Sequence, residues 1–306
     1  MDRFQEMQVF MAVADEEGFA AAARRLNLSP PSVTRAIAAL EERIGTQLLA
    51  RTTRSLHLSE AGQLYLEDCR RILAELEEAE ESASGSYTTP RGQLTVTASV
   101  IFGELFMTPI LAGYLDLFPS VNINALFVDR LVNLVDEGVD VAIRIGNLPE
   151  SSQQTIKVGE VSQVICGTPA YFSEHGRPQH PDDLRQARVV MSSASHLLSD
   201  WQFVDNGKVL ELRPEPRLVV SANQAAINAA SLGWGLTRVL SYQVASKVAA
   251  GELEIVLQDF APPSLPIHIV YQGGSRVPAK IRTFVDFCAE RMGQDRALNP
   301  SAKSAN

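Results

Sequence analysis

The apolar positions at the start of the chain predict three short helices. Residues 3–14 carry apolar side chains at helical spacing, at Phe4, Met7, Phe10, Met11 and Ala14. The Ala-rich segment 19–26 follows Gly18 and predicts a second helix. In the segment 30–44 the apolar positions recur at i, i+4, i+7 and i+11, which predicts a third helix with one buried face made of Val33, Ile37, Leu40 and Ile44.

The third helix has clear start and stop signals. Ser29 stands where an N-cap belongs, Pro30 suits the first helical position, and Gly45 ends the helix. Two short helices joined by a brief turn are typical of a helix-turn-helix. Residues 46–59 then alternate leucine, threonine and arginine as a hairpin can use them, so we expect a wing beside the helices.

A long helix is predicted over residues 60–84, with Ser59 as its cap. Its apolar side chains step by four and three residues in a heptad seam: Tyr65, Cys69, Ile72, Leu76, Ala79 and Ala83. A lone helix of this length would leave the seam in water. We therefore expect a partner helix from a second copy of the chain; the alternative is that the seam packs on the chain's own body.

From residue 93 onward the pattern changes to alternating strands and helices, after a Ser/Gly/Pro-rich hinge at 84–92. Strands at 93–100, 121–129 and 139–146 alternate with helices at 102–118 and 131–138, which predicts a mostly parallel sheet covered by helices. A second unit begins near 161–176. It continues with a strand at 217–223, a helix at 224–235, a strand at 266–272 and a helix at 279–292.

Composition narrows the class of protein. The 306 residues are too many for one ordinary core, and 45% hydrophobic with 21% charged residues is typical of a soluble globular chain. No stretch approaches the length of a membrane helix, early acids argue against a secretory signal, and the three cysteines are far apart with no CxxC. We expect a cytoplasmic protein with no membrane partner.

The net charge of −9 does not exclude a nucleic-acid partner, because DNA meets a local patch. Residues 24–54 contain six arginines against two glutamates, a local balance of +4.

The segment 21–62, "AAARRLNLSPPSVTRAIAALEERIGTQLLARTTRSLHLSEAG", resembles the N-terminal signature of the LysR-type transcriptional regulators. "GVDVAIRIG" and "GTPAYFSEHG" resemble phrases of one subgroup, and the order and length of the α/β remainder agree. The resemblance implies an α/β fold overall: an all-α winged helix-turn-helix at 1–62, a dimerising linker helix and hinge at 63–90, and an effector domain at 91–306. That domain is expected to resemble periplasmic binding proteins, with lobe I at about 91–163 and 267–300 and lobe II at about 164–266.

The function implied is that of a transcriptional regulator, which binds promoter DNA as a homo-oligomer and responds to a small molecule. Tetramers are common in the family, but the sequence itself indicates only a homodimer, through the heptad seam. Catalysis has little support, because the chain lacks GxSxG, HExxH and P-loop motifs and its five histidines show no metal spacing, so we expect no cofactor. A transport receptor would share the back two-thirds of the fold but would lack residues 1–90.

The DNA contacts are expected at the start of the third helix, which would lie in the major groove. The outward residues there are Pro31, Ser32, Thr34 and Arg35. Arg35 can contact guanine, or it can contact phosphate or solvent. Many relatives have glutamine where this chain has Pro30, so that base contact is not carried over. On the wing we expect Arg51, Arg54 and His57 to meet phosphates or the minor groove, the alternative being a solvated hairpin.

The effector residues are expected where strands run into helix starts, because ligands of α/β sheets bind there and helix N-termini favour anions. The residues in such places are Ser99, Val100, Val128, Asp129, Ser221, Asn223 and Gln224, with Arg144 as a nearby cation and Ser192, Ser193 and Ser195 on the opposite wall. For each the alternative is an ordinary cap or turn. A small organic acid or an aromatic is the expected ligand, although Asp129 would repel a carboxylate unless Arg144 offsets it. Cys166 is expected to be buried as a small hydrophobe, the alternative being an oxidant sensor.

Overall fold

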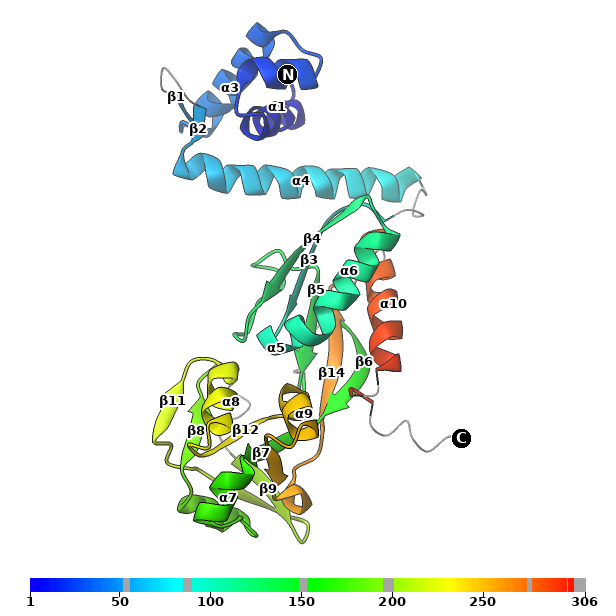
Figure 1. The fold of residues 1–306 in the computed structure, drawn as a ribbon. Coiled ribbons are helices and arrows are strands. Elements are labelled where there is room, and N and C mark those ends of the chain that lie inside the picture. The colour runs from blue at the N-terminus through cyan, green and yellow to red at the C-terminus, as the bar shows by residue number, and fades with distance from the viewer. Residues whose placement is uncertain are drawn as a thin grey trace. The chain divides into compact units, whose positions relative to one another are not determined.

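The computed structural model describes residues 1–51, 56–84, 90–148, 153–194, 201–273, 277–295 and 297–299. The chain divides into two compact units, Met1–Thr88 and Thr89–Asn306 (Figure 1).

The first unit contains three helices, a hairpin and a long helix, as the sequence predicts. They are α1 (Arg3–Asp15), α2 (Phe19–Arg25), α3 (Pro30–Ile44), β1 (Leu49–Arg51), β2 (Leu56–Leu58) and α4 (Glu60–Ser84). The start of α3 is as expected. The Ser29 hydroxyl accepts the Ser32 N–H at 3.3 Å, and Pro30, at the first helical position, has no backbone N–H that would need an acceptor. Gly45 takes the left-handed conformation (φ +78°) that ends the helix.

Two apolar positions of this unit lie outside the core, contrary to prediction. Phe4 of α1 is 43% exposed, while Val9 and Val13 are buried in its place. Because α1 contacts both α3 and α4, its buried face is wider than the predicted stripe and turned away from Phe4. Ile44 of α3 is 38% exposed, because the last turn of the helix extends past the core.

Lobe I of the second unit is a five-stranded sheet with the order β4-β3-β5-β14-β6. Its strands are β3 (Gly92–Ala98), β4 (Val121–Phe127), β5 (Val141–Ile145), β6 (Gln154–Val161) and β14 (Leu265–Tyr271). β3 runs parallel to β4 and β5, whereas β14 is antiparallel to β5 and β6. The helical segment is α5 (Val100–Phe102), a π-helical turn (Gly103–Met107) and α6 (Thr108–Leu117), and the last helix is α10 (Ala279–Gln294).

Lobe II is a second five-stranded sheet with the order β11-β8-β12-β7-β13, beside a separate hairpin. The sheet contains β7 (Gln163–Gly167), β8 (Val189–Ser192), β11 (Leu218–Val220), β12 (Leu236–Leu240) and β13 (Glu254–Val256), and the hairpin contains β9 (Trp201–Asp205) and β10 (Lys208–Leu212). The helices are α7 (Pro169–His175), α8 (Asn223–Ser231) and α9 (Ser241–Ala249), with short 3-10 helices at Pro181–Arg185 and Gln258–Phe260. The chain returns to lobe I through β14, so lobe I is built from two separate stretches of sequence.

The predicted helix at 131–138 is wrong, because these residues form turns. Val132 and Leu134 are buried against Ala142, and Arg130 forms an ion pair with Glu137 at 2.5 Å that fastens the turns. These contacts bury the two apolar side chains without a helix, because Val132 and Leu134 are two residues apart and pack on the same cluster.

The segment Val100–Leu117 also departs from prediction, since its 18 residues have a mean hydropathy of 1.5 and are long and apolar enough to span a membrane. In the structure Phe102, Met107 and Tyr114 are fully buried in the lobe I core. Packing in the core accounts for these three residues, whereas Leu105 and Leu117 of the same segment are more than half exposed.

Candidate DNA-binding surface and effector-binding junction

The start of α3 presents an exposed polar turn. Pro31, Thr34 and Arg35 are exposed, and Ser32 is half-buried. The Arg35 guanidinium lies back along the helix, where Nε donates to the Pro31 carbonyl at 3.4 Å and Nη2 to the Ser32 hydroxyl at 3.5 Å. These hydrogen bonds are long and therefore weak, so the guanidinium can exchange them for a base edge or a phosphate.

A carboxylate fastens the wing to α3. Glu41 Oε1 accepts the backbone N–H groups of Leu48 (2.8 Å) and Leu49 (3.0 Å), at the start of β1. Ser59 closes the other side, because its N–H donates to the Leu48 carbonyl at 2.9 Å while its hydroxyl caps α4 by accepting the Gly62 N–H at 2.9 Å. The hairpin is thus attached both to α3 and to the start of α4.

Of the three wing residues, the structure describes only one side chain. His57 of β2 is exposed. Arg51 belongs to β1, but its side chain lies outside the described part of the chain, and Arg54 lies outside it altogether.

The local positive charge is smaller than the sequence window indicates. Arg25 pairs with Asp15 at 3.3 Å, and Arg43 pairs with Glu6 at 2.8 Å. Both acids belong to α1, which lies outside the 24–54 window. The exposed Arg24 forms no ion pair with the residues that the structure describes, and it accompanies Arg35 as an available cation.

The seam predicted for dimerisation divides along α4. Cys69 is fully buried within its own unit and Tyr65 packs on Phe10 with ring centroids 5.7 Å apart, so the first part of the seam packs on the chain's own body. The prediction of a dimer contact is wrong for Cys69. Ile72 and Leu76 are half-buried, and the side chain of Ala79 lies outside the described part of the chain.

Five predicted effector residues come together where the lobes meet. Asp129 Oδ1 accepts the Val100 N–H at 3.1 Å, and the Asn223 amide of lobe II donates to Asp129 Oδ2 at 3.5 Å. The Ser99 hydroxyl lies 3.5 Å from the Tyr242 hydroxyl, which also belongs to lobe II. Val128 stands beside them, with its N–H bonded to the Ala98 carbonyl at the end of β3.

Tyr242 is a junction residue that the sequence pattern did not predict. Its ring meets Phe102 and Phe106 edge-on, at centroid distances of 5.5 and 5.6 Å. Burial raises the pKa of Tyr242 to about 12, so its hydroxyl stays protonated at neutral pH. The available signal was its position two residues after β12, near a strand end like the other junction residues.

The remaining predicted effector residues make local contacts. Arg144 Nη2 donates to the Val132 carbonyl at 2.5 Å, and burial lowers the pKa of this guanidinium. Gln224 bonds Asn228 within its own helix at 2.9 Å, and the Ser193 hydroxyl donates to the Val220 carbonyl at 3.3 Å. Ser192 makes a local turn bond, Ser221 is exposed, and Ser195 lies outside the described residues.

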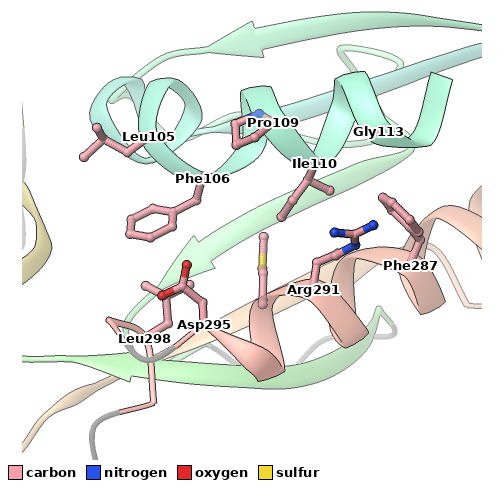
Figure 2. A pocket seen from close by; sticks show the side chains of 10 residues that line it. Leu105, Phe106, Pro109, Ile110, Gly113, Phe287, Arg291, Asp295 and Leu298 are labelled. Atoms are coloured by element: carbon pink, nitrogen blue, oxygen red, sulfur yellow. The ribbon is translucent and has the colours of Figure 1, made fainter. Parts of the chain in front are cut away.

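Three surface hollows lie elsewhere in the second unit. One of about 220 Å³ lies between α6 and α10, where Phe106, Ile110 and Phe287 line it and Arg291 and Asp295 stand near its edge (Figure 2). Another, of about 180 Å³, lies in lobe II and a third, of about 390 Å³, lies beside β6. The predicted effector residues line none of these three.

The lobe II hollow includes Arg238, whose guanidinium lies 5.8 and 5.6 Å from the ring centroids of Trp201 and Phe203. Burial lowers the pKa of Arg238 to about 10. Cys166 is fully buried, as predicted, and burial raises the pKa of its thiol to about 12. A thiol in this environment is poorly suited to sensing oxidants.

Comparisons with known proteins match both parts of the chain. A family model described as "Bacterial regulatory helix-turn-helix protein, lysR family" matches residues 4–63, and one described as "LysR substrate binding domain" matches residues 88–293. The chain belongs to the LysR family.

Curated relatives of this LysR-type regulator agree with the assignment. It is 32% identical to an HTH-type transcriptional regulator of Xanthomonas campestris, over 94% of this chain and 85% of that protein. It is 28% identical to the HTH-type transcriptional activator AaeR of Escherichia coli, over 94% and 93%. It is also 28% identical to an HTH-type transcriptional repressor of Pseudomonas aeruginosa, over 96% and 94%.

Solved structures of the family share the fold. The full-length virulence activator AphB of Vibrio cholerae has a TM-score of 0.61 at 25% identity, covering 94% of this chain and 99% of that one. CrgA of Neisseria meningitidis has a TM-score of 0.61 at 26% identity, covering 95% and 99%.

This protein is therefore a DNA-binding transcriptional regulator with a helix-turn-helix domain and a two-lobed α/β effector-binding domain. The family comprises transcriptional regulators, not enzymes, and its members bind DNA and small-molecule effectors and form oligomers.

Proposed function

We propose that this LysR-type regulator reads promoter DNA with the first turn of α3, acts in the cytoplasm as a homodimer that can pair into a tetramer, and is controlled by a small molecule held where the two lobes meet. The observation that carries the proposal is the exposed turn containing Ser32, Thr34 and Arg35. In a helix-turn-helix the start of the second helix faces the base edges of the major groove.

Two features of this turn suit base reading. The adjacent prolines make the helix start rigid and leave it without backbone donors, so the recognition surface is made of side chains. Arg35 then carries the only flexible cation among the described residues of α3's first two turns, and its present hydrogen bonds are weak. A bidentate contact to guanine contributes about 1–3 kcal/mol of discrimination.

Dimerisation is proposed through the part of α4 beyond the helix-turn-helix core. Cys69 and Tyr65 are used within the chain, but Ile72 and Leu76 keep partly exposed apolar surface. On another face of the helix, Leu64 is 64% exposed. A second copy of the chain would bury such surface, because two helices can cover one another's apolar stripes.

Substituting Arg35 tests the DNA-binding part. The operator is first located as an interrupted palindrome in the DNA just upstream of the coding sequence. Anisotropy titrations then compare wild type, Arg35→Ala and the matched exposed variant Arg24→Ala on operator and scrambled duplexes. We expect Arg35→Ala to lose roughly 5- to 100-fold on the operator and much less on the scrambled duplex.

Arg24→Ala is expected to lose similar affinity on both duplexes, as a phosphate contact does. Equal losses on both duplexes for Arg35→Ala would refute base reading by this residue. Failure of the wild type to prefer the operator over the scrambled duplex would refute the proposed operator.

A further inference from the structure

The junction between the lobes already holds a negative charge at the place where a helix would otherwise attract an anion. The 18-residue helical segment begins at Val100, and its first N–H is taken by the Asp129 carboxylate at 3.1 Å. A carboxylate ligand arriving there would meet the negative charge of Asp129 beside the helix N-terminus. Asp129 forms no ion pair within the part of the chain that the structure describes. Arg144, the cation that could have offset it, donates to the Val132 carbonyl instead.

Asn223 adds a second acceptor. Asn223 is only 5% exposed. Its Nδ2 donates to Asp129, so the amide oxygen, Oδ1, is the group that can accept a further hydrogen bond. That oxygen is buried and accepts no hydrogen bond from the residues that the structure describes. The orientation of the amide is determined by Asp129, because reversing it would place two oxygens against each other. A buried polar atom without a partner is unfavourable, so a ligand donor there would be favourable.

The other polar groups at the junction can adapt to a ligand. The Ser99 and Tyr242 hydroxyls are 3.5 Å apart, and the Tyr242 hydroxyl is also 3.5 Å from the Gln243 amide. Hydroxyl groups both donate and accept, so they do not select the charge of a ligand. The edge-on rings of Phe102, Phe106 and Tyr242 give the junction an apolar side.

We propose that the effector presents a hydrogen-bond donor group, an amine or a hydroxyl, to Asp129 and Asn223, and that it is not a simple carboxylate. This inference rests on the proposed effector function of the junction. The sequence predicts an organic acid or an aromatic, and this proposal replaces the organic acid. The reason is that the Asp129 carboxylate and the Asn223 amide oxygen are both acceptors, and the carboxylate is also negatively charged. The interlobe hydrogen bonds are long and therefore weak, so a small molecule can replace them.

The test uses probes that differ only in the polar group. Benzylamine, benzyl alcohol and benzoate form one matched set, and butylamine, butanol and butyrate form an aliphatic set. Each is titrated at equal ionic strength into the full chain, with the midpoint of thermal unfolding and the dissociation constant as readouts. We expect the amine or the alcohol to stabilise the protein and the carboxylate of the same set to have little effect.

Two variants locate the effect. Asp129→Asn keeps an acceptor for the Val100 N–H, so the contact at the helix start is retained. The new amide NH2 faces Asn223, whose own amide can turn over to present its oxygen. It is expected to weaken binding of the amine about tenfold or more. Asp116→Asn, an exposed residue of α6, removes the same charge from the same lobe and is expected to leave binding unchanged.

Three results would overturn the inference: a carboxylate that stabilises most, an amine effect that survives Asp129→Asn, or no probe that stabilises at all. Operator binding by the wild type without any probe is measured in parallel. If operator binding is retained while the carboxylate gives the largest shift, the ligand chemistry is wrong and the regulator assignment stands. Loss of operator preference would refute the proposed function itself.

Discussion

The contact between Glu41 and the wing leads to a measurable prediction. Glu41 Oε1 accepts two backbone N–H groups, those of Leu48 and Leu49, and both residues are buried. Removing the carboxylate by Glu41→Ala leaves these two donors without a protein partner. A hydrogen bond to a charged group contributes about 1.5–3 kcal/mol, and we discount the pair to about 2–4 kcal/mol because the Glu41 side chain is partly exposed.

Hydrogen exchange of the full chain, measured by mass spectrometry on peptides that cover residues 46–62, reports the local opening of the wing. A loss of about 2–4 kcal/mol corresponds to exchange that is roughly thirtyfold to several hundredfold faster at these amides. Glu41→Gln keeps an acceptor oxygen and should lose only about 1 kcal/mol.

Glu42→Ala is the matched control. It removes the same charge from the adjacent position of α3, where the side chain is exposed. A surface change of this kind is expected to alter stability by less than about 0.5 kcal/mol. If Glu41→Ala and Glu42→Ala speed exchange in the wing equally, the two hydrogen bonds do not hold the hairpin and the reasoning is refuted.

Two further predictions concern packing and pH. A Cβ added at Gly62 would lie 2.0 Å from the Leu48 carbonyl oxygen. Gly62→Ala should therefore push the start of α4 away from the wing and destabilise the first unit by at least about 1–3 kcal/mol. Denaturant unfolding monitored by far-UV circular dichroism measures this loss, and an unchanged unfolding curve would contradict the prediction. Burial raises the pKa of Cys69 to about 11 and of Cys166 to about 12, above that of an unfolded thiol. These thiols therefore contribute stability that is complete below about pH 8.5 and is lost as pH rises toward pH 11–12, and Cys166→Ala should show a shallower decline in alkaline denaturant titrations than the wild type.

The features that sequence alone determined are local ones. The N-cap by Ser29, the proline start of α3 and its end at Gly45 act through neighbours within about four residues, so they can be recognised along the chain. The bounds of α4 and of the wing hairpin follow from the same kind of signal. Strand ends are also partly legible in the sequence, and for this reason the strand-to-helix pattern predicts Ser99, Asp129 and Asn223 as residues of one ligand site.

Tertiary structure decided which side chains are buried or paired and which are available for a partner. Cys69 is buried in the core of the first unit, Arg43 is paired with Glu6, and the 131–138 segment does not form the predicted helix. Asp129 accepts the Val100 N–H, and the Asn223 oxygen has no hydrogen-bond partner among the described residues, which is why we propose an effector with a donor group and not a carboxylate. The physical reason is common to all of these: each contact joins residues distant in sequence, and a side chain's charge, burial and partner depend on which distant residues the fold brings against it.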